Sequence, residues 1–480
     1  MTVEIHIHGP ISLVKGDYPF TKVRLATSYP VEGAQFSNAY RRGLWDGRKH
    51  LLKKATGAFP TGLVSCVKDA CEDSGAAVTV VDHREPPVPR QAGFALQGIS
   101  MSGKYSYQLD ACEKAIEAKQ GILKMATNAG KTEVSAAIVN HLGLKTLFVV
   151  TTRELMYQAR SRYIERLQAT EEQIGLVGDG HWSPGSWVTI ATVGTLSSRL
   201  DTQECQELLE STEILFLDEA HHTGSEELFT ITTLCPAFYR YGMSGTPLDR
   251  TDGANLRLIA ATGDVIVEIS NKFLVDKGIS AKAHIVWDRI TTPVLGKRVA
   301  YPSAYKQGIS ENPELLSRVV EWTKLFKKQG LSTLILVEEI SQGKILDDYL
   351  WTKTDGEFIP HQFIHGSEST DIRKSALADF GDRKLPVLIA STIVDEGIDV
   401  PTIDALILAG SRKSRIRTMQ RLGRGLRGKR LIVVEFANFC HDYLLKHSMT
   451  RLKDYKKEEC FDIHQSGPSE TLIKTLWGVP

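Results

Sequence analysis

Residues 124–142 read KMATNAGKTEVSAAIVNHL and join an apolar segment to a helix-like segment through a polar turn. A bound phosphate needs converging backbone N–H groups, a flexible glycine for close approach and a lysine for its charge, and a hydroxyl holds the accompanying Mg²⁺. Gly130, Lys131 and Thr132 supply the last three. The stretch therefore predicts a strand–loop–helix unit that binds nucleotide phosphates.

The match to a phosphate-binding loop is incomplete in one place. The first glycine of the pattern G-x-x-x-x-G-K-[ST] is Met125 here, and a Gly-Lys-Thr at a helix start is common by chance.

Further along, the apolar run ILFL ends in a second polar segment that begins Asp218-Glu219. A carboxylate at the carboxyl end of a buried strand lies where open α/β sheets bind ligands.

These two carboxylates suit metal-assisted hydrolysis of a phosphoanhydride. Asp218 is expected to hold Mg²⁺ through water, and Glu219 to orient and deprotonate the attacking water. A solvated acidic loop is the alternative for either residue taken alone. The presence of both segments in this order favours a nucleotide-hydrolysing site.

Short apolar runs alternate with amphipathic segments after the first hundred residues, which predicts parallel sheets covered by helices on both faces. The pattern restarts near residue 275, so we expect two α/β halves. The expected organisation is a small N-terminal domain at 1–85, a Pro-rich linker at 86–103, a nucleotide-binding domain at 104–272, a second domain at 273–445 and a C-terminal tail at 446–480.

The bulk composition is that of an ordinary globular protein. Of the 480 residues, 42% are hydrophobic and 24% charged, and the net charge is +1, so any nucleic-acid binding must come from local patches. We expect no membrane span and no signal peptide, and a cytoplasmic location. The seven cysteines are scattered without a CxxC pair, which predicts free thiols and no zinc site.

Eight ordered segments carry a resemblance to a known group of enzymes. MATNAGKT, VTTRELMYQ, ATVGTL, LDEAHH and MSGTP resemble motifs I, Ia, Ib, II and III of superfamily 2 helicases, and FIHGSES, ASTIVDEGIDVP and QRLGRGLR resemble motifs IV/IVa, V and VI. The resemblance implies an α/β fold with two tandem RecA-like parallel-sheet domains, preceded by a small α+β domain. It also implies ATP and Mg²⁺ as cofactors and a nucleic-acid strand as partner.

Two shorter segments narrow this resemblance. FLVDKGISAKAHI, between the halves, is similar to the UvsW and XPB branch, and GLWDGRKHLL…FPTGLVSCV resembles the N-terminal domain of UvsW-type helicases, which remodel branched DNA. The function implied is an ATP-dependent DNA helicase or translocase acting on forked and Holliday-like DNA. An RNA helicase, the motor subunit of a restriction system, and a binding scaffold with an inactive ATPase stay open as alternatives. Nothing in the sequence indicates protein partners.

The resemblance also implies roles for individual residues. It assigns nucleotide binding to Gln108, Thr127, Asn128, Ala129, Gly130, Lys131, Thr132, Gly397 and Asp399, and Mg²⁺ binding to Thr132 and Asp218. It assigns catalysis to Lys131, Asp218, Glu219, Gln420, Arg424 and Arg427, with the two arginines as fingers for the γ-phosphate. Gln108 would recognise adenine, although an ordinary exposed helix glutamine is the alternative.

Further residues are implied to transmit the effect of ATP or to hold the strand. His221, Ser244 and Thr246 resemble the coupling residues that link the ATP site to domain closure, with local capping as the alternative for Ser244 and Thr246. Contacts to the strand backbone are assigned to Thr152, Arg153, Thr195, His365, Gly366 and Thr392.

The segment YRRGLWDGRKHLLKK, residues 40–54, has six Lys and Arg residues against one Asp. Interleaved basic and aromatic residues suit a surface for DNA phosphates. We expect this surface to be formed by Arg41, Arg42, Arg48, Lys49 and Trp45. For Trp45, packing in the core is an open alternative to stacking on DNA.

Overall fold

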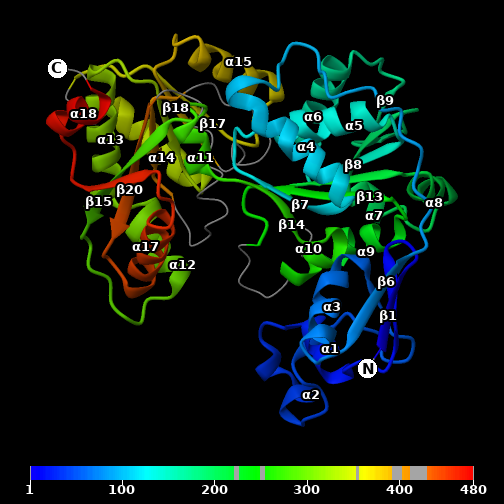
Figure 1. Ribbon diagram of the computed structural model, residues 1–480. Helices are drawn as coiled ribbons and strands as arrows, with labels where there is room; N and C mark the ends of the chain where they lie inside the picture. The colour runs from blue at the N-terminus through cyan, green and yellow to red at the C-terminus, as the bar shows by residue number, and fades with distance from the viewer. Residues whose placement is uncertain are drawn as a thin grey trace. The chain divides into compact units, whose positions relative to one another are not determined.

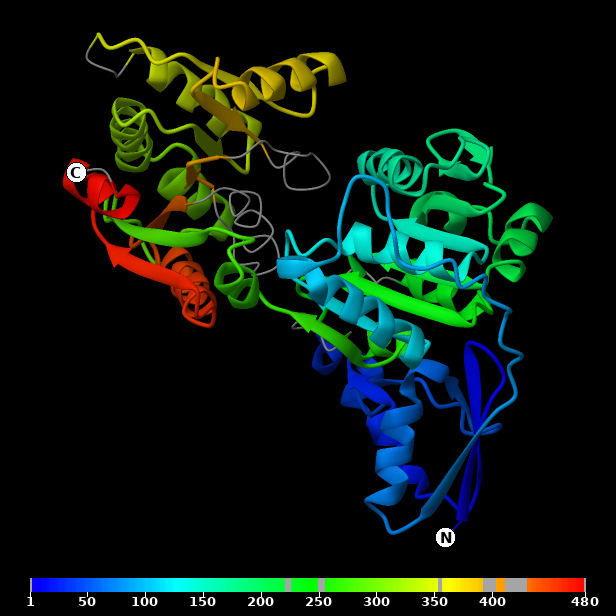
Figure 2. The ribbon, with the colours of Figure 1, turned by 45° about the horizontal axis from the view of Figure 1, so that its top comes forward.

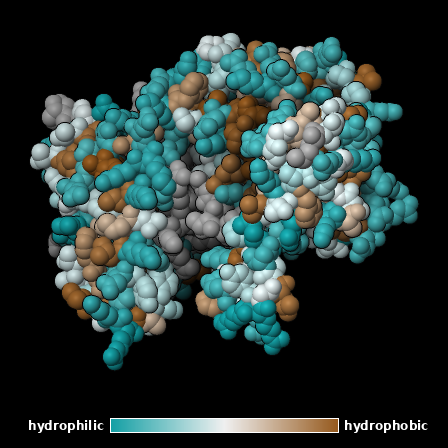
Figure 3. All heavy atoms as spheres, turned by 60° about the horizontal axis from the view of Figure 1, so that its bottom comes forward, coloured by the Kyte–Doolittle hydropathy of each residue, from teal (hydrophilic) through white to brown (hydrophobic). Residues whose placement is uncertain are grey.

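A computed structural model describes residues 2–220, 226–248, 255–352, 356–391, 403–410 and 430–478. Contacts divide the chain into two compact units, Met1–Ser270 and Asn271–Pro480 (Figures 1 and 2). In the described part of the chain, no helix is both long and apolar enough to span a membrane. The face seen in Figure 3 is mainly hydrophilic, with apolar residues in small groups.

The first unit begins with a four-stranded sheet in the order β5-β2-β1-β6. Its strands are β1 (Thr2–Ile7), β2 (Ile11–Gly16), β5 (Ala58–Pro60) and β6 (Ala77–Asp82), and the helices α1 (Phe20–Ala26) and α3 (Val64–Glu72) pack together beside it. Burial alternates along β1, so that Val3 and Ile5 are buried while Thr2 and Glu4 are exposed. One face of this sheet therefore forms the core of a small α+β domain.

This small domain packs on the larger part of the first unit. Its hydrophobic cluster includes Ala260 of α10 (Asn255–Thr262), with Ile259 against it. A Cβ at Gly62 would collide with the backbone of Ile259, so only glycine permits this close approach. Removing the small domain would therefore expose apolar surface on α10.

The larger part of the first unit is an eight-stranded sheet in the order β10-β9-β11-β8-β12-β13-β7-β14. The strands are β7 (Gln120–Met125), β8 (Thr146–Val150), β9 (Ile174–Gly178), β10 (His181–Ser183), β11 (Val188–Thr192), β12 (Ile214–Asp218), β13 (Tyr239–Ser244) and β14 (Val265–Ile269). All neighbours are parallel except β10 and β9.

Helices cover both faces of this sheet, as its continuous apolar strands require. In Figure 1, α4 (Ser106–Ala118), α5 (Lys131–Leu142) and α6 (Arg153–Leu167) lie on one face, and α7 (Val193–Ser197), α9 (Glu226–Leu234) and α10 lie on the other. The carboxyl ends of the parallel strands meet at one edge. The polar motifs that follow β7, β8, β11, β12 and β13 are therefore brought to the same edge.

The second unit contains a seven-stranded parallel sheet in the order β17-β18-β16-β19-β20-β15-β21. Its strands are β15 (Lys282–Ile290), β16 (Thr333–Leu336), β17 (His361–Ile364), β18 (Val387–Ala390), β19 (Ala405–Leu408), β20 (Arg430–Asn438) and β21 (Phe461–Gln465). The helices include α11 (Asn271–Asp276), α12 (Tyr301–Tyr305), α13 (Pro313–Lys328), α14 (Ile340–Thr352), α15 (Thr370–Gly381), α17 (Asp442–Tyr455) and α18 (Glu470–Trp477).

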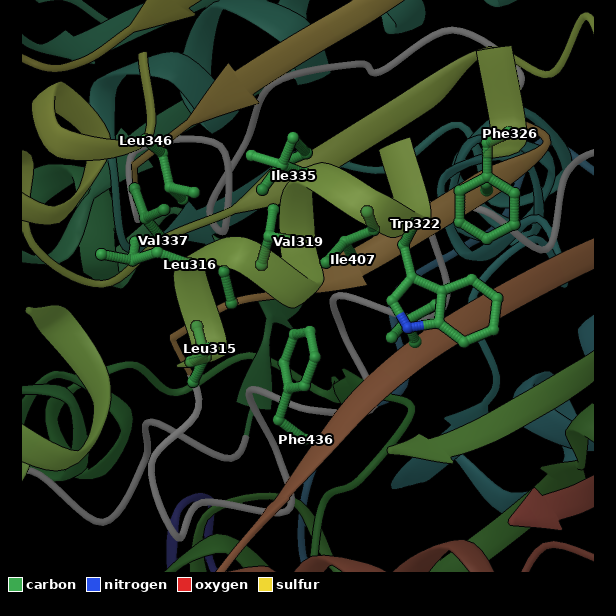
Figure 4. Close-up of a cluster of buried hydrophobic side chains, with 14 of the residues drawn as sticks. Leu315, Leu316, Val319, Trp322, Phe326, Ile335, Val337, Leu346, Ile407 and Phe436 are labelled. Carbon is green, nitrogen blue, oxygen red and sulfur yellow. The ribbon is translucent and has the colours of Figure 1, made fainter. Parts of the chain in front are cut away.

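Two hydrophobic clusters form the core of the second unit. Figure 4 shows one of them, in which Leu316, Val319 and Trp322 of α13 meet side chains of β16, β19 and β20. The C-terminal residues take part in this fold, because β21 extends the sheet beside β15 and Ile473 of α18 is buried in the cluster. Residues 446–480 thus contribute β21, α18 and most of α17 to the second unit.

Candidate functional site

The segment between β7 and α5 is shaped to hold an anion. Asn128 and Gly130 have φ angles of 72° and 82°, both in the left-handed region. Such residues turn successive backbone N–H groups toward one concave side, where they bind phosphate oxygens. Gly130 is also the N-cap of α5, so the positive end of the helix lies at the same place. Thr127, Ala129, Lys131 and Thr132 complete this segment.

The missing first glycine of the phosphate-loop pattern has a structural explanation. Met125 is the last residue of β7 and its side chain is fully buried. The departure from the pattern therefore lies in the strand, whereas the turn that would face the phosphate keeps its glycine. A methionine fills the space in the core there without changing the turn.

Asp218 is the last residue of β12, and Glu219 follows it. β12 lies two strands from β7, with β13 between them. The Glu219 backbone N–H donates to Asp218 Oδ1 at 2.9 Å, and Glu219 has a φ of 47°. A left-handed conformation at a residue other than glycine costs roughly 1–3 kcal/mol and is common at functional sites. The tight turn places the two carboxylates at the carboxyl edge of the sheet.

The pKa of Asp218 depends on a charge in the phosphate loop. Burial raises the pKa of Asp218 above its usual range, the charge of Glu219 raises it further, and the charge of Lys131 lowers it. The positive charge of Lys131 thus compensates part of the cost of burying this carboxylate. A buried carboxylate and the Thr132 hydroxyl are hard oxygen donors, which fits Mg²⁺.

Gln108 lies against the phosphate loop from α4. Its side chain is 6% exposed and its Nε2 donates to the Ala129 carbonyl at 3.1 Å. The hydroxyl of the neighbouring Tyr107 donates to the same carbonyl at 3.0 Å, and burial raises the pKa of Tyr107 to about 12. Gln108 is thus buried beside the loop rather than exposed on a helix surface, and Tyr107, which the sequence did not single out, helps to hold the loop.

We expect Gln108→Ala to raise the KM for ATP and to weaken the preference for ATP over GTP. A lost amide contact to a base typically costs about 0.5–1.5 kcal/mol, or roughly a threefold to tenfold effect. Steady-state hydrolysis of ATP and GTP measures it. Gln203→Ala is a matched control, because Gln203 is on the exposed helix α8 (Gln203–Glu210), where its amide contacts Glu207. An unchanged preference for ATP over GTP in Gln108→Ala would exclude Gln108 as the residue that recognises adenine.

The segment after β13 lies beside the start of the phosphate loop. Ser244 is fully buried at the end of β13, and its Oγ accepts a hydrogen bond from the Thr246 backbone N–H at 3.1 Å. A Cβ at Gly245 would come within 3.4 Å of the Met125 carbonyl oxygen. The Ser244 hydroxyl thus stabilises the turn at residues 244–246. This turn packs against the start of the phosphate loop, so a movement of the loop would be transmitted to it.

The first unit contains three residues that are expected to contact the nucleic-acid strand: Thr152, Arg153 and Thr195. They lie at the carboxyl edge of the sheet, after β8 and β11. Thr152 caps α6, since its hydroxyl accepts from the Leu155 N–H at 3.3 Å. Arg153 forms an ion pair with Asp179 at 2.8 Å, and this hydrogen bond, together with one from Tyr157, holds the pKa of Asp179 below its usual range. No sequence motif pointed to Asp179, which a DNA phosphate would have to displace.

The other residues expected to contact the nucleic-acid strand form no ion pair among the described residues. The Thr192 hydroxyl donates to Thr195 Oγ1 at 3.0 Å. In the second unit, His365 and Gly366 follow β17, and the His365 backbone N–H donates to Glu368 at 3.0 Å. Gly366 is exposed. These residues, too, follow the carboxyl ends of strands.

In the small N-terminal domain, the basic residues divide into two groups. Arg48 donates to Ser28 through Nε at 2.9 Å and Nη2 at 2.7 Å, and Lys49 contacts Glu226 of α9 at 3.2 Å. Trp45 is half-buried, and its Nε1 donates to the Arg48 carbonyl at 2.8 Å. These three side chains have partners inside the protein.

Arg41 and Arg42 form the second group. Both are exposed, and the Arg41 side chain donates from Nε to the Gln35 carbonyl at 3.2 Å. Their guanidinium groups are therefore better placed for an external anion than those of the first group. The remaining expected site residues lie outside the described residues: His221, Thr392, Gly397, Asp399, Gln420, Arg424 and Arg427.

Comparison with known proteins matches both halves of the chain. Residues 103–249 match the family described as "Type III restriction enzyme, res subunit", and residues 313–429 match "Helicase conserved C-terminal domain". The ATP-dependent DNA helicase UvsW of Enterobacteria phage T4 is 24% identical over 505 residues, covering 96% of this chain and 98% of that protein. The DNA 3'-5' translocase XPB2 of Sulfurisphaera tokodaii is 26% identical over 354 residues, covering 67% and 78%.

A solved structure supports the architecture independently. Dbp5 of S. cerevisiae, bound to RNA and ADP BeF3, has a TM-score of 0.54 at 16% identity and covers 78% of this chain and 97% of that one. Similarity at this level concerns the fold alone. The predicted fold class is confirmed: two parallel-sheet α/β domains of the RecA-like type, with a small α+β domain before them.

Proposed function

The chain belongs to superfamily 2 of the ATP-dependent helicases, and we propose that it is a DNA helicase or translocase that unwinds or branch-migrates forked and Holliday-like DNA. The observation that carries the ATPase part is the left-handed turn at Asn128 and Gly130 on the same sheet edge as Asp218 and Glu219. Similarity over nearly the whole chain to a phage DNA helicase supports DNA as the strand.

In the proposed ATPase site, the loop N–H groups and Lys131 bind the β- and γ-phosphates. Thr132 and Asp218 would hold Mg²⁺, which when bound neutralises charge on the phosphate oxygens. Glu219 accepts the proton of the attacking water. Gly397, Asp399, Gln420, Arg424 and Arg427 are proposed from their motifs to act on the same nucleotide from the second domain.

We propose that the two RecA-like domains bind and release the DNA strand in turn during each ATP cycle. Each domain contacts the sugar-phosphate backbone of the DNA and not its bases, which permits movement that is independent of DNA sequence. The residues proposed for this grip are Thr152, Arg153, Thr195, His365, Gly366 and Thr392. Since the proposed substrate is DNA, we propose that the protein acts in the cytoplasm. For a protein of phage origin, this is the cytoplasm of the host cell.

We propose that Arg41 and Arg42 contact the branch, and expect Arg41→Glu/Arg42→Glu to reduce fork processing strongly while leaving ATPase activity on single strands near wild type. Two charge reversals turn phosphate attraction into repulsion. Point variants suit this question better than deletion of residues 1–85, because deletion would uncover α10. Lys15→Glu/Lys68→Glu, at other positions of the same domain, is the charge-matched control. Normal fork processing by the first variant would contradict a branch-reading role for this surface.

The substrate is tested by one comparison with the purified protein. Unwinding of forked DNA, Holliday junctions, plain DNA duplex and RNA duplex is measured at equal concentrations with ATP. We expect forks and junctions to be processed fastest. Preference for the RNA duplex would favour an RNA helicase, and movement along plain duplex without strand separation would favour the motor of a restriction system.

A further inference from the structure

Three potential metal ligands meet at the edge of the second sheet, on β15 and the edge strand β21. His284 lies opposite Asp462 in the parallel register, and Val286 lies opposite His464. Alternate residues of a strand point to the same face. Asp462 and His464 therefore share a face, and His284 joins them there.

The distances between these side chains are those expected of ligands around one ion. His464 Nε2 is 3.4 Å from His284 Nδ1, and His284 Nδ1 is 3.5 Å from Asp462 Oδ2. In a tetrahedral zinc site with bonds of about 2.0–2.2 Å, neighbouring ligand atoms lie about 3.3–3.6 Å apart. Among the described residues, this is the one group of three such side chains with ligand atoms within 4.8 Å of one another.

We propose that His284, Asp462 and His464 form a binding site for Zn²⁺. Two imidazole nitrogens and one carboxylate oxygen are a donor set that zinc takes in proteins, with water as the fourth ligand. All three residues are partly exposed, which leaves room for that water. The scattered cysteines led us to expect no zinc site, but this donor set uses none of them.

Lys282 gives the site a distinctive property. Its Nζ lies 2.8 Å from Asp462 Oδ2, the same oxygen that faces His284. A bound Zn²⁺ must displace this ammonium or share the carboxylate with it, and the two positive charges repel each other. Removing the charge of Lys282 should therefore strengthen zinc binding, whereas a simple network of hydrogen bonds and ion pairs predicts no such effect.

The ion would fasten the C-terminal strand to the rest of the second unit. Among the described residues, β21 pairs with β15 on one side and has no partner strand on the other, and it connects α17 to α18. A metal bridge between the two strands ties together residues that are far apart in the chain, and it stabilises the folded state by binding only there. This role does not depend on ATP hydrolysis.

Zinc binding is tested with the full chain, stripped of metal by a chelator and titrated with Zn²⁺ against a chromophoric chelator. We expect His464→Ala to bind one Zn²⁺ fewer than wild type, Asp462→Asn to bind at least about tenfold more weakly and Lys282→Gln to bind more tightly. His181→Ala, an exposed histidine of β10, is the control and should bind as wild type does. Saturating Zn²⁺ should raise the Tm of the second unit by about 5–10 °C in wild type but not in His464→Ala.

Three results would each overturn the site. They are a wild-type chain that binds no Zn²⁺, a zinc count unchanged in both His464→Ala and Asp462→Asn, and equal losses in His181→Ala and His464→Ala. If His464→Ala does not fold, Asp462→Asn and Lys282→Gln decide, because Asn has nearly the shape of Asp and Lys282 is exposed. Failure of the ATPase proposal would leave these outcomes unaffected.

Discussion

Lys131→Ala will abolish ATP hydrolysis while leaving DNA binding measurable. Lys131 is the first residue of α5 and follows the left-handed Gly130, so its ammonium group lies where the β- and γ-phosphates of ATP would meet the helix N-terminus. Without it, charge developing on the transferred phosphoryl loses the cation that the phosphate loop supplies. We expect turnover to fall by at least about 10²–10³-fold, as when one donor to a transition-state oxyanion is removed.

Phosphate release measures this loss, and fluorescence anisotropy with labelled DNA measures binding. Lys145→Ala is the matched control, because Lys145 is exposed immediately before β8, at the amino ends of the strands and thus at the opposite edge of the same sheet. It should hydrolyse ATP as wild type does. Wild-type turnover in Lys131→Ala would refute the assignment of the phosphate loop.

Glu219→Gln will remove hydrolysis and leave ATP binding intact. The amide keeps the shape of the side chain but cannot accept the proton of the attacking water, and general-base catalysis typically contributes about 10²–10⁴-fold. The same change removes the negative charge that raises the pKa of Asp218, so the Asp218 carboxylate stays available. We therefore expect loss of the chemical step without loss of the nucleotide.

A single-turnover measurement of phosphate release, together with binding of a fluorescent ATP analogue, separates these two effects. Glu213→Gln is the control at the other end of β12, where the Glu213 carboxylate accepts from the Lys145 backbone N–H at 2.8 Å. It should retain hydrolysis. A Glu219→Gln protein that still turns over ATP at the wild-type rate would exclude Glu219 as the base.

The sequence was sufficient for the fold class because parallel strands buried on both faces read as continuous apolar runs. TLFVV of β8 is buried at every position, and so is VTIAT of β11. The phosphate loop could also be predicted, since Gly130 needs a left-handed φ that favours glycine. Met125 looked like a defect in the pattern, and only its burial in β7 explains it.

The partners of charged side chains could not be predicted in the same way. A basic run shows the charge of Arg48 but not that it turns inward to Ser28, and nothing in the sequence pairs Arg153 with Asp179. The ion pair between Glu435 and Arg451, almost fully buried, likewise joins side chains from a strand and a following helix. Such pairings depend on register and packing, which local patterns do not determine.

The zinc site shows the same limit at longer range. His284 and His464 belong to strands at opposite ends of the second unit's chain, and they become neighbours only because β21 adds to the sheet beside β15. Metal-binding patterns in a sequence are recognised from ligands a few residues apart. Asp462 and His464 alone, two residues apart on a strand, do not form such a pattern.

The most direct test of the central claim is steady-state ATP hydrolysis by the purified chain without DNA, with single-stranded DNA and with forked DNA. A DNA helicase must couple its ATPase to the strand, so we predict slow turnover alone and a marked increase when DNA is added, with Lys131→Ala inactive under all three conditions. Turnover that is absent, or that is the same with and without DNA, would contradict the assignment of this chain as an ATP-dependent DNA helicase.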